Sequence, residues 1–555
     1  MLSTRSSAVA SKKIDFFYDA ISPYAWFAFE VLMRYKKHWN VEIQLKPVHL
    51  AAIGKATGNT APLLVPNKGR YMAKDLLRCG TYFNVPVKLV GDANELMVKG
   101  SLVPSRFLTA IDLLYPDYLE AASRALWMEV WNKDEDITTL ETLERAGEVA
   151  GLTKDQRAHI QEHMTQEVTK NRLETYTEEA VQYGAFGLPA IVAHTGGEPM
   201  LFFGSDRFPV LAQEIGEKWL GPEPDVPQTR LMHIEANLTS DTFTCYTDGS
   251  VDKQGQETGG AVNGGTSSGP FFTSGYQQSL YAGVPPLQRL YYYAFYGHLN
   301  PNNLYLVIAI SVSPSMLAAL NLTRMLSTRS SAVASKKIDF FYDAISPYAW
   351  FAFEVLMRYK KHWNVEIQLK PVHLAAIGKA TGNTAPLLVP NKGRYMAKDL
   401  LRCGTYFNVP VKLVGDANEL MVKGSLVPSR FLTAIDLLYP DYLEAASRAL
   451  WMEVWNKDED ITTLETLERA GEVAGLTKDQ RAHIQEHMTQ EVTKNRLETY
   501  TEEAVQYGAF GLPAIVAHTG GEPMLFFGSD RFPVLAQEIG EKWLGPEPDV
   551  PQTRL

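Results

Sequence analysis

The sequence predicts an α/β fold that is built twice in one chain. Residues 1–231 recur without a substitution as residues 325–555. Within one copy, short apolar runs typical of strands lie at both ends, and segments with helical spacing lie between them. Solenoid repeats have periods of about 20–50 residues, whereas a unit of this length falls within the usual domain size of about 50–250 residues. We therefore expect two complete domains joined by residues 232–324.

Each copy begins with a pattern that predicts β-α-β. Residues 14–18 form a short apolar and aromatic run, which suits a buried strand. Serine is favoured at a helix N-cap and proline is tolerated at the first helical position, so Ser22 and Pro23 indicate a helix start. Residues 41–48 alternate between apolar and polar side chains, as a second strand would.

The rest of the copy is mainly helical and then returns to strands. Residues 71–183 show helical spacing, and we expect them to form a helical domain inserted into the α/β unit. Residues 186–194 and 199–206 are predicted strands, and residues 207–219 are a predicted closing helix. This order indicates an α/β architecture with a helical insertion.

Composition indicates an ordinary folded protein. Hydrophobic residues make up 45% and charged residues 21% of the chain, and the net charge of −10 gives no reason to expect a nucleic-acid partner. Each copy holds one cysteine, Cys79 or Cys403, which predicts a reducing compartment. Cys79 is either a reactive thiol or a small buried apolar residue. His159 and His163 lack a His-Glu-x-x-His context, so we expect no metal site.

Four sequence blocks carry a family resemblance. They are FFYDAISPYAWFAFE, LVPNKGRYMAKDL, YGAFGLPAIVAH and LFFGSDR, in this order in each copy. Together they resemble the kappa-class glutathione transferases. The resemblance implies a thioredoxin-like fold with an inserted all-helical domain, as in DsbA, repeated twice in the chain. Residues 22–25 stand where related oxidoreductases have Cys-x-x-Cys, so we expect no redox-active sulfur there.

The resemblance implies that Ser22, and Ser346 in the second copy, act on the thiol of bound glutathione. A free thiol has a pKa of about 8.5 and must lose its proton to become a nucleophile. The positive end of a helix and a hydroxyl hydrogen bond both favour the thiolate. The alternative for Ser22 is a helix cap without catalytic function.

Other positions match glutathione contacts of the family. They are Pro23, Tyr24, Asn59, Lys68, Leu188, Pro189, Ser205 and Asp206, repeated as Pro347, Tyr348, Asn383, Lys392, Leu512, Pro513, Ser529 and Asp530. The resemblance implies a cis peptide bond before Pro189, with Leu188 binding the cysteinyl part through its backbone. It assigns Ser205 and Asp206 to the α-amino end, unless they merely cap the last helix. Asn59 and Lys68 would bind the glycine end, or they are turn residues of a Gly- and Pro-rich loop.

The implied activity is conjugation of glutathione, as co-substrate, to an apolar electrophile, together with peroxide reduction. Two alternatives stay open, namely a glutathione-dependent 2-hydroxychromene-2-carboxylate isomerase and a non-catalytic DsbA-like binding module. The resemblance also implies a dimer, formed either between chains or by the two copies within one chain. Isothermal titration with glutathione separates binding from non-binding classes.

The linker and the chain ends carry weaker signals. Residues 258–269 are rich in glycine and serine, and residues 245–262 resemble a ribonuclease H fragment with one of its several carboxylates, Asp248. Residues 304–322 carry no charge and approach the roughly 20 residues that span a bilayer. The linker is thus either a natural tether or a product of a fused gene prediction. The basic, serine-rich start favours a mitochondrial location and residues 553–555 a peroxisomal one, with the cytoplasm as the alternative.

Overall fold

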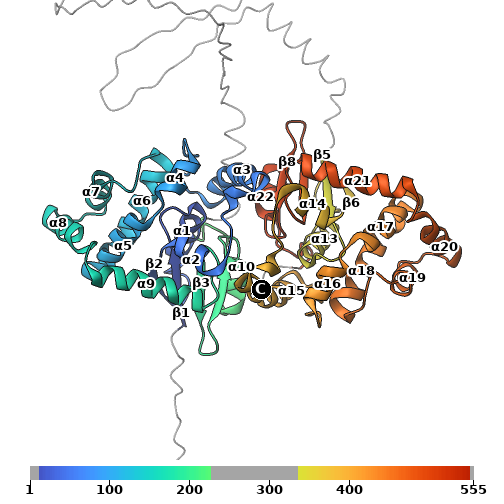
Figure 1. Ribbon diagram of the computed structural model, residues 1–555, viewed down its shortest axis with the longest axis horizontal. Helices are drawn as coiled ribbons and strands as arrows, with labels where there is room; N and C mark the ends of the chain where they lie inside the picture. Colours follow the sequence, from blue (N-terminus) through green and yellow to red (C-terminus); the bar gives the residue numbers. More distant parts are fainter. Residues whose placement is uncertain (1–11, 227–335, 551–555) are drawn as a thin grey trace, which may run out of the picture. The chain divides into compact units, whose positions relative to one another are not determined.

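The computed structural model describes residues 12–226 and 336–550 (Figure 1). The described residues of both copies belong to one compact unit. The predictions for the linker, with its residues 304–322, and for both chain ends fall outside the described residues. Within the described ranges, no helix has the length and apolar character needed to cross a membrane.

Each copy holds a mixed four-stranded sheet in the order β2-β1-β3-β4 or β6-β5-β7-β8. The strands are β1 (Lys12–Tyr18), β2 (Val41–Pro47), β3 (Ala190–His194) and β4 (Met200–Phe203), repeated as β5 (Lys336–Tyr342), β6 (Val365–Pro371), β7 (Ala514–His518) and β8 (Met524–Phe527). β1 is parallel to β2 and antiparallel to β3. Because Phe17 pairs with Ala190, the end of β1 and the start of β3 lie at the same edge of the sheet. Asp19, which follows β1, and Pro189, which precedes β3, therefore both lie at this edge.

The helices of the first copy are α1 (Pro23–Tyr35), α2 (Leu50–Thr57), α3 (Pro66–Phe83), α4 (Ala93–Lys99), α5 (Leu102–Leu114), α6 (Leu119–Lys133), α7 (Leu140–Val149), α8 (Lys154–His163), α9 (Glu167–Gln182) and α10 (Phe208–Glu214). Those of the second copy are α13 (Pro347–Tyr359), α14 (Leu374–Thr381), α15 (Pro390–Phe407), α16 (Ala417–Lys423), α17 (Leu426–Leu438), α18 (Leu443–Lys457), α19 (Leu464–Val473), α20 (Lys478–His487), α21 (Glu491–Gln506) and α22 (Phe532–Glu538). Short 3₁₀ turns connect some of these helices. The elements expected from periodicity are therefore present in both copies.

Two helix boundaries differ from the prediction. Helices begin before residue 71, because Pro66 occupies the first position of α3 and α2 precedes it. The closing helix α10 ends at Glu214 instead of residue 219, since Gly216 adopts a φ of 66° that other residues rarely take. Lys68 consequently lies in the first turn of a helix and not in a loop.

One aromatic core joins the sheet to the helices. The rings of Phe16 and Tyr18 on β1 stack at 5.3 Å, and Phe29 on α1 packs against Trp127 on α6 at 4.9 Å. The Tyr18 hydroxyl lies 2.7 Å from Ser123 Oγ in α6, so its polar atom is satisfied within the core. Each such buried side chain contributes roughly 1.5–3 kcal/mol to folding. This packing fixes α1, and therefore its N-terminus, relative to the sheet.

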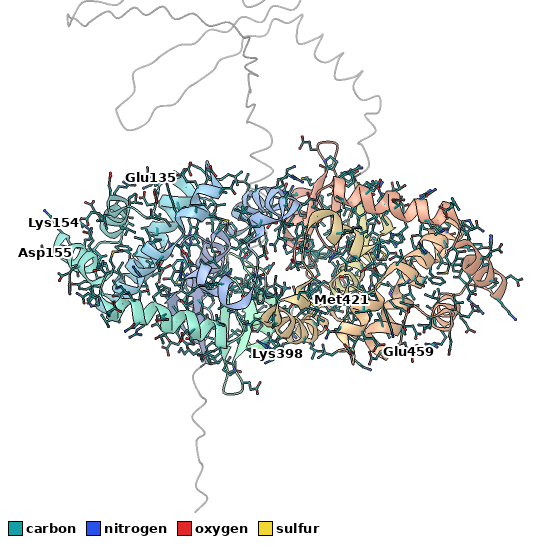
Figure 2. All side chains as sticks on the ribbon, viewed as in Figure 1. Glu135, Lys154, Asp155, Lys398, Met421 and Glu459 are labelled. Carbon is teal, nitrogen blue, oxygen red and sulfur yellow. The ribbon has the colours of Figure 1, made fainter. Side chains whose placement is uncertain are left out.

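Several charged residues of the helical region lie at the protein surface. Glu135, which follows α6, and Lys154 and Asp155, in the first turn of α8, are exposed and extend from the surface (Figure 2). Helix α8 starts with a capping box in which Thr153 Oγ1 accepts from Gln156 N and the Gln156 side chain accepts from Thr153 N. Thr153 is exposed, so this N-cap lies at the protein surface, whereas Ser22 is buried.

Candidate functional site

Ser22 caps α1 and keeps its hydroxyl hydrogen unused. Its Oγ accepts a hydrogen bond from Ala25 N at 3.2 Å, and Pro23 occupies the first helical position. The cap uses an oxygen lone pair, and no described group accepts the Ser22 O–H. The side chain is 6% exposed at the positive end of the helix. Ser346 repeats this arrangement with Ala349 N. The structural role and the proposed catalytic role of this serine are therefore compatible.

Asp19 fixes the turn that carries Ser22. Its Oδ1 accepts from Ile21 N at 3.0 Å, while its Oδ2 accepts from Leu50 N at 2.9 Å and from Ser101 Oγ at 2.5 Å. In the second copy, the corresponding carboxylate accepts from Ser346 N itself at 3.0 Å. Burial raises the pKa of Asp19 to about 6. The turn before α1 is thus held by partners from α2 and α5 of its own copy.

Leu188 presents free backbone groups at the same edge of the sheet. The Leu188–Pro189 bond is cis, as the resemblance implies, and β3 starts at the next residue. Gly204 N donates to Pro189 O at 3.2 Å, which ties the cis turn to the end of β4. Among the described groups, none forms a hydrogen bond with the N–H or C=O of Leu188. These two groups are therefore open to an extended peptide ligand.

Asp206 and its neighbour Arg207 form a buried charge cluster with residues of the second copy. Arg531 Nη1 donates to Asp206 Oδ2 at 2.5 Å, and Arg207 Nη1 donates to Asp530 Oδ2 at 2.6 Å. Arg207 also donates through Nε to Asp399 Oδ1 at 3.0 Å, while Arg531 does the same to Asp75. α10 is preceded by Arg207 without a side-chain cap, so neither Ser205 nor Asp206 has the capping role that was the alternative.

The carboxylates of Asp206 and Asp530 lie in the same charge cluster and affect each other's pKa. Burial, and then the charge of Asp530, raises the pKa of Asp206 to about 7. Burial alone would raise the pKa of Asp530 as well, but the charges of Arg207 and Arg531 lower the pKa of that carboxyl. Because the two groups titrate as a pair, the pair retains one proton up to about neutral pH. Ser205 Oγ is also buried and has no partner among the described groups, so this turn holds unused polar groups.

Asn59 and Lys68 do not meet each other within one copy. Asn59 Nδ2 donates to Phe186 O at 2.6 Å, just before the cis turn, and its Oδ1 accepts from Lys392 Nζ of the second copy at 2.8 Å. Lys392 Nζ also lies 5.4 Å from the centre of the Phe186 ring. Burial, and then the charge of Lys68, lowers the pKa of Lys392 to about 8. Lys68 makes the reciprocal contact with Asn383.

Tyr24 connects the Ser22 turn to the charge cluster. Its hydroxyl donates to Asp75 Oδ2 at 2.8 Å, and Arg531 pairs with both Asp75 and Asp206. Burial alone would raise the pKa of Asp75, but the charge of Arg531 and the hydrogen bonds hold it below the usual range. The residues expected from the first copy are thus brought together with Lys392 and Arg531 of the second copy, and the twin residues form the reciprocal set.

Cys79 lies beside this cluster as a buried apolar residue. Both Cys79 and Cys403 are free and 1% exposed. Burial, and then the charge of Asp75, raises the pKa of Cys79 well above its usual value, which disfavours a reactive thiolate. Across the described ranges, no three His, Cys, Asp or Glu side chains are positioned to hold a metal ion.

The sequence reasoning missed Arg207 and Asp75. Arg207 directly follows the Ser205–Asp206 pair, and Asp75 lies four residues before Cys79 on the buried face of α3. A charged residue on an otherwise apolar helical face is a signal for a buried ion pair. The partners could not be found in the same way, because they come from the other copy.

Comparison with known proteins agrees with this architecture. The DSBA-like thioredoxin domain matches residues 13–216 and again residues 337–540. Glutathione S-transferase kappa 1 of Homo sapiens is 44% identical over 221 residues, which covers 40% of this chain and 98% of the human protein. The kappa 1 enzyme of Rattus norvegicus is 43% identical over 223 residues, covering 40% of this chain and 99% of that protein. A 2-hydroxychromene-2-carboxylate isomerase of Pseudomonas sp. (strain C18) is 23% identical over 207 residues, covering 37% and 90%.

The sheet order, the inserted helices and the two domain matches define a DSBA-like thioredoxin protein. Within this class, the chain belongs to the kappa-class glutathione transferase family and carries two tandem copies of its domain. The family resemblance read from the four sequence blocks is confirmed.

Proposed function

We propose that each copy binds glutathione, stabilises its thiolate at the N-terminus of α1 or α13, and conjugates it to an apolar electrophile. The observation that carries this proposal is the unused hydroxyl hydrogen of Ser22 at a helix N-terminus. Membership of the kappa class supports it, since the matched relatives are named glutathione S-transferases. The family assignment supports a transferase-type enzyme, and the geometry supports the serine hydroxyl as the hydrogen-bond donor to the glutathione thiolate.

The chemistry follows from the charge on sulfur. The Ser22 O–H donates to the thiolate while the α1 dipole adds positive potential, and both lower the pKa of the bound thiol. The thiol proton passes to solvent. The thiolate then attacks the electrophilic carbon, a C–S bond forms, and the leaving group departs with its bonding electrons. Ser22 itself forms no covalent bond, so the protein supplies orientation and electrostatics.

The rest of glutathione has complementary partners. The free N–H and C=O of Leu188 suit the cysteinyl backbone, as in an added strand. The unpartnered Ser205 hydroxyl and the Asp206 carboxylate suit the α-amino acid end. Asn59 together with Lys392 suits the glycine carboxylate, because a half-buried ammonium favours an anionic partner.

We further propose that the two copies act as a pair within one chain, and that each glutathione site takes residues from both. Lys392 and Arg531 would complete the site of Ser22, while Lys68 and Arg207 would complete the site of Ser346. The Lys392–Asn59 and Arg531–Asp206 contacts support this pairing. Mass measurement by light scattering tests it, since the mass of one chain is expected, and a dimer of chains would contradict self-contained pairing.

The catalytic proposal is tested with a matched pair of N-cap variants. Ser22→Ala/Ser346→Ala removes the hydroxyls, and Thr153→Ala/Thr477→Ala removes two N-caps of α8 and α20. Both doubles lose caps of similar strength, about 0.5–2 kcal/mol each. We expect conjugation of a halogenated nitrobenzene to fall by about 10²-fold or more only in the serine double, as for other preorganised donors. Equal activity of the two doubles would overturn the assignment.

Titration of glutathione gives an independent measurement. Two glutathione molecules per chain are expected to bind the wild-type protein. The serine double should retain this binding with weaker affinity, because the remaining contacts persist, and its bound thiol should titrate at higher pH. A folded chain that binds no glutathione would contradict the proposed function.

A further inference from the structure

A cavity of the first copy is lined by Arg106, whose guanidinium forms no hydrogen bond or ion pair with a described residue. The cavity has a volume of about 690 Å³ and is lined by residues of α2, α5 and α9, among them Arg106, Leu102 and Leu173. This volume lies within the range of small-molecule sites, about 300–1,000 Å³. None of the residues assigned above to glutathione lines it. It is therefore a different site from the one at Ser22.

Arg106 differs from every other described arginine of its copy. Each of the others donates at least one hydrogen bond, namely Arg34, Arg70, Arg78, Arg124, Arg145, Arg157, Arg172 and Arg207. Arg106 is half-buried, forms no hydrogen bond or ion pair with a described residue, and has a buried Nε without an acceptor. Its twin Arg430 has the same unpartnered Nε.

The second copy provides a related observation. A cavity of about 530 Å³ there is lined by Arg430 together with residues of α17, α19 and α20, including Leu464 and Met488. The same arginine position therefore lines a cavity in each copy, although the other lining residues do not correspond, because α20 is the twin of α8 and not of α2 or α9. Leaving a buried donor without an acceptor is unfavourable, and more so when the group is charged. Because the Nε donor has no acceptor in either copy, this arginine is suited to bind an anionic ligand.

The surroundings restrict the charge and shape of that ligand. Lys170 also lines the first cavity, and it pairs with Glu167 at 2.6 Å. Glu174 and Glu178 line the cavity as well, but both are exposed and neither pairs with Arg106. Their charges disfavour a dianion such as phosphate. Leu102, Leu173 and Val181 provide apolar walls beside the guanidinium.

We propose that this cavity binds a small monocarboxylate with an apolar body, and that Arg106 in the first copy and Arg430 in the second hold the carboxylate. A guanidinium binds a carboxylate through two parallel N–H bonds, which suits an arginine whose Nε is unused. His49 lines the same cavity, and burial followed by the charge of Arg106 lowers the pKa of its imidazole. The imidazole is therefore neutral at pH 7 and does not compete for the carboxylate as a cation.

The proposed carboxylate site is separate from the glutathione site, but residues next to its cavity contact the turn that carries Ser22. Leu50 and Ser101 adjoin the cavity residues His49 and Leu102, and both donate to Asp19 in the turn before Ser22. A ligand that contacts this wall therefore touches the elements that hold the Ser22 turn. Binding itself is expected without glutathione, so failure of the glutathione proposal would leave this one testable.

Calorimetric titration of the full chain with 2-naphthoate tests the proposal. We expect wild-type protein to bind two naphthoates per chain, and Arg106→Gln alone to bind one. Arg106→Gln/Arg430→Gln should lose about tenfold to a hundredfold in affinity, the effect of a charged hydrogen bond. The neutral isostere 2-naphthalenemethanol should bind weakly and equally to both proteins. Inorganic phosphate should not displace naphthoate.

A matched arginine variant serves as the control. Arg145→Gln/Arg469→Gln removes arginines that lie on α7 and α19 outside the first cavity and already pair with glutamates. Naphthoate affinity should be unchanged in it, and circular dichroism should report a native helix content for all variants. Equal naphthoate affinity in the Arg106/Arg430 double and the wild type would overturn the proposal. So would phosphate binding as tight as that of naphthoate, or no binding of naphthoate to the wild type.

Discussion

Two turns of the same copy meet at the candidate site, and they are stabilised in different ways. The Ser22 turn is held by Asp19, Leu50 and Ser101, all from its own copy. The turn that carries Asp206 and Arg207 is neutralised by charges of the second copy. The proposed thiolate-stabilising centre thus depends on contacts within its own copy, whereas the proposed site for the α-amino end of glutathione also includes charges of the other copy.

The difference has an electrostatic cause. The Ser22 turn contains one buried carboxylate, and neutral donors of the backbone and of Ser101 satisfy it. The Asp206 turn places two opposite charges next to each other, and the adjacent guanidinium and carboxylate of one copy lie 3.6 Å apart. Asp206 and Arg207 therefore pair more closely with Arg531 and Asp530 of the other copy, at 2.5 and 2.6 Å. A buried charge without such a partner is strongly destabilising.

The largest effect is expected from removing the arginines of the second turn. Arg207→Gln/Arg531→Gln leaves Asp75 and Asp399 buried without their counter-charges, and breaking a buried pair costs about 3–5 kcal/mol. We expect the midpoint of urea unfolding to fall sharply and glutathione binding to be lost. Arg145→Gln/Arg469→Gln is the control and should change stability less, because Glu129 and Glu453 keep Lys133 and Lys457 as partners. A stability equal to that control would mean that the cluster does not hold the copies together.

Crossed variants test which lysine serves which serine. Ser22→Ala/Lys68→Ala places both changes in the first copy, whereas Ser22→Ala/Lys392→Ala divides them between copies. If sites are shared as proposed, the first variant damages both sites and the second damages one, leaving about half of the wild-type turnover per chain. Sites confined to single copies predict the reverse order. Steady-state conjugation at glutathione concentrations below the wild-type KM distinguishes the two, because loss of a binding contact raises KM, and the two variants serve as controls for each other.

A smaller effect is expected from pH. The pKa of Asp206 is raised to about 7, so the native chain keeps a proton that the unfolded chain releases near pH 3.8. Stability from this group is therefore complete at low pH and is lost as pH rises from about 4 to about 7. Asp19 and Asp343 act in the same direction, with pKa values raised by burial to about 6 and about 7. The lowered pKa of His49 acts in the opposite direction near pH 6.5.

Comparing Asp206→Asn with the wild type isolates the contribution of the Asp206–Asp530 pair to the pH dependence of stability. We expect Asp206→Asn to flatten the dependence of unfolding free energy on pH between 5 and 7, by up to about 1.4 kcal/mol per pH unit. Urea unfolding at several pH values measures this slope. Asp225→Asn/Asp549→Asn is the control, because the pKa values of these carboxyls are lowered and act only below the tested range. An unchanged slope in Asp206→Asn would contradict a shared proton.

The sequence predicted the features that depend on neighbouring residues better than the contacts between the two copies. Apolar periodicity and the Ser22–Pro23 pair located the strands and α1, because these signals depend on neighbouring residues. Helix α2 was missed, since its eight residues make only about two turns and include Gly54, which favours no helix. The contact of Lys68 with Asn383 could not be predicted, because it joins two copies of the same motif. The unpartnered state of Arg106 is likewise a property of tertiary packing.

The smallest effect is expected at exposed charges between the same copies. Lys398 lies 3.9 Å from Glu198, with side chains 63% and 92% exposed, and Lys74 lies 3.8 Å from Glu522 (Figure 2 labels Lys398). Solvent screens such pairs, and holding two long side chains in place opposes their attraction. Lys74→Gln/Lys398→Gln should therefore leave the urea midpoint and glutathione affinity unchanged within error. A loss comparable to that of the Arg207/Arg531 double would show that association of the copies depends on surface charge, and the buried cluster would then lose its assigned role in holding the second turn.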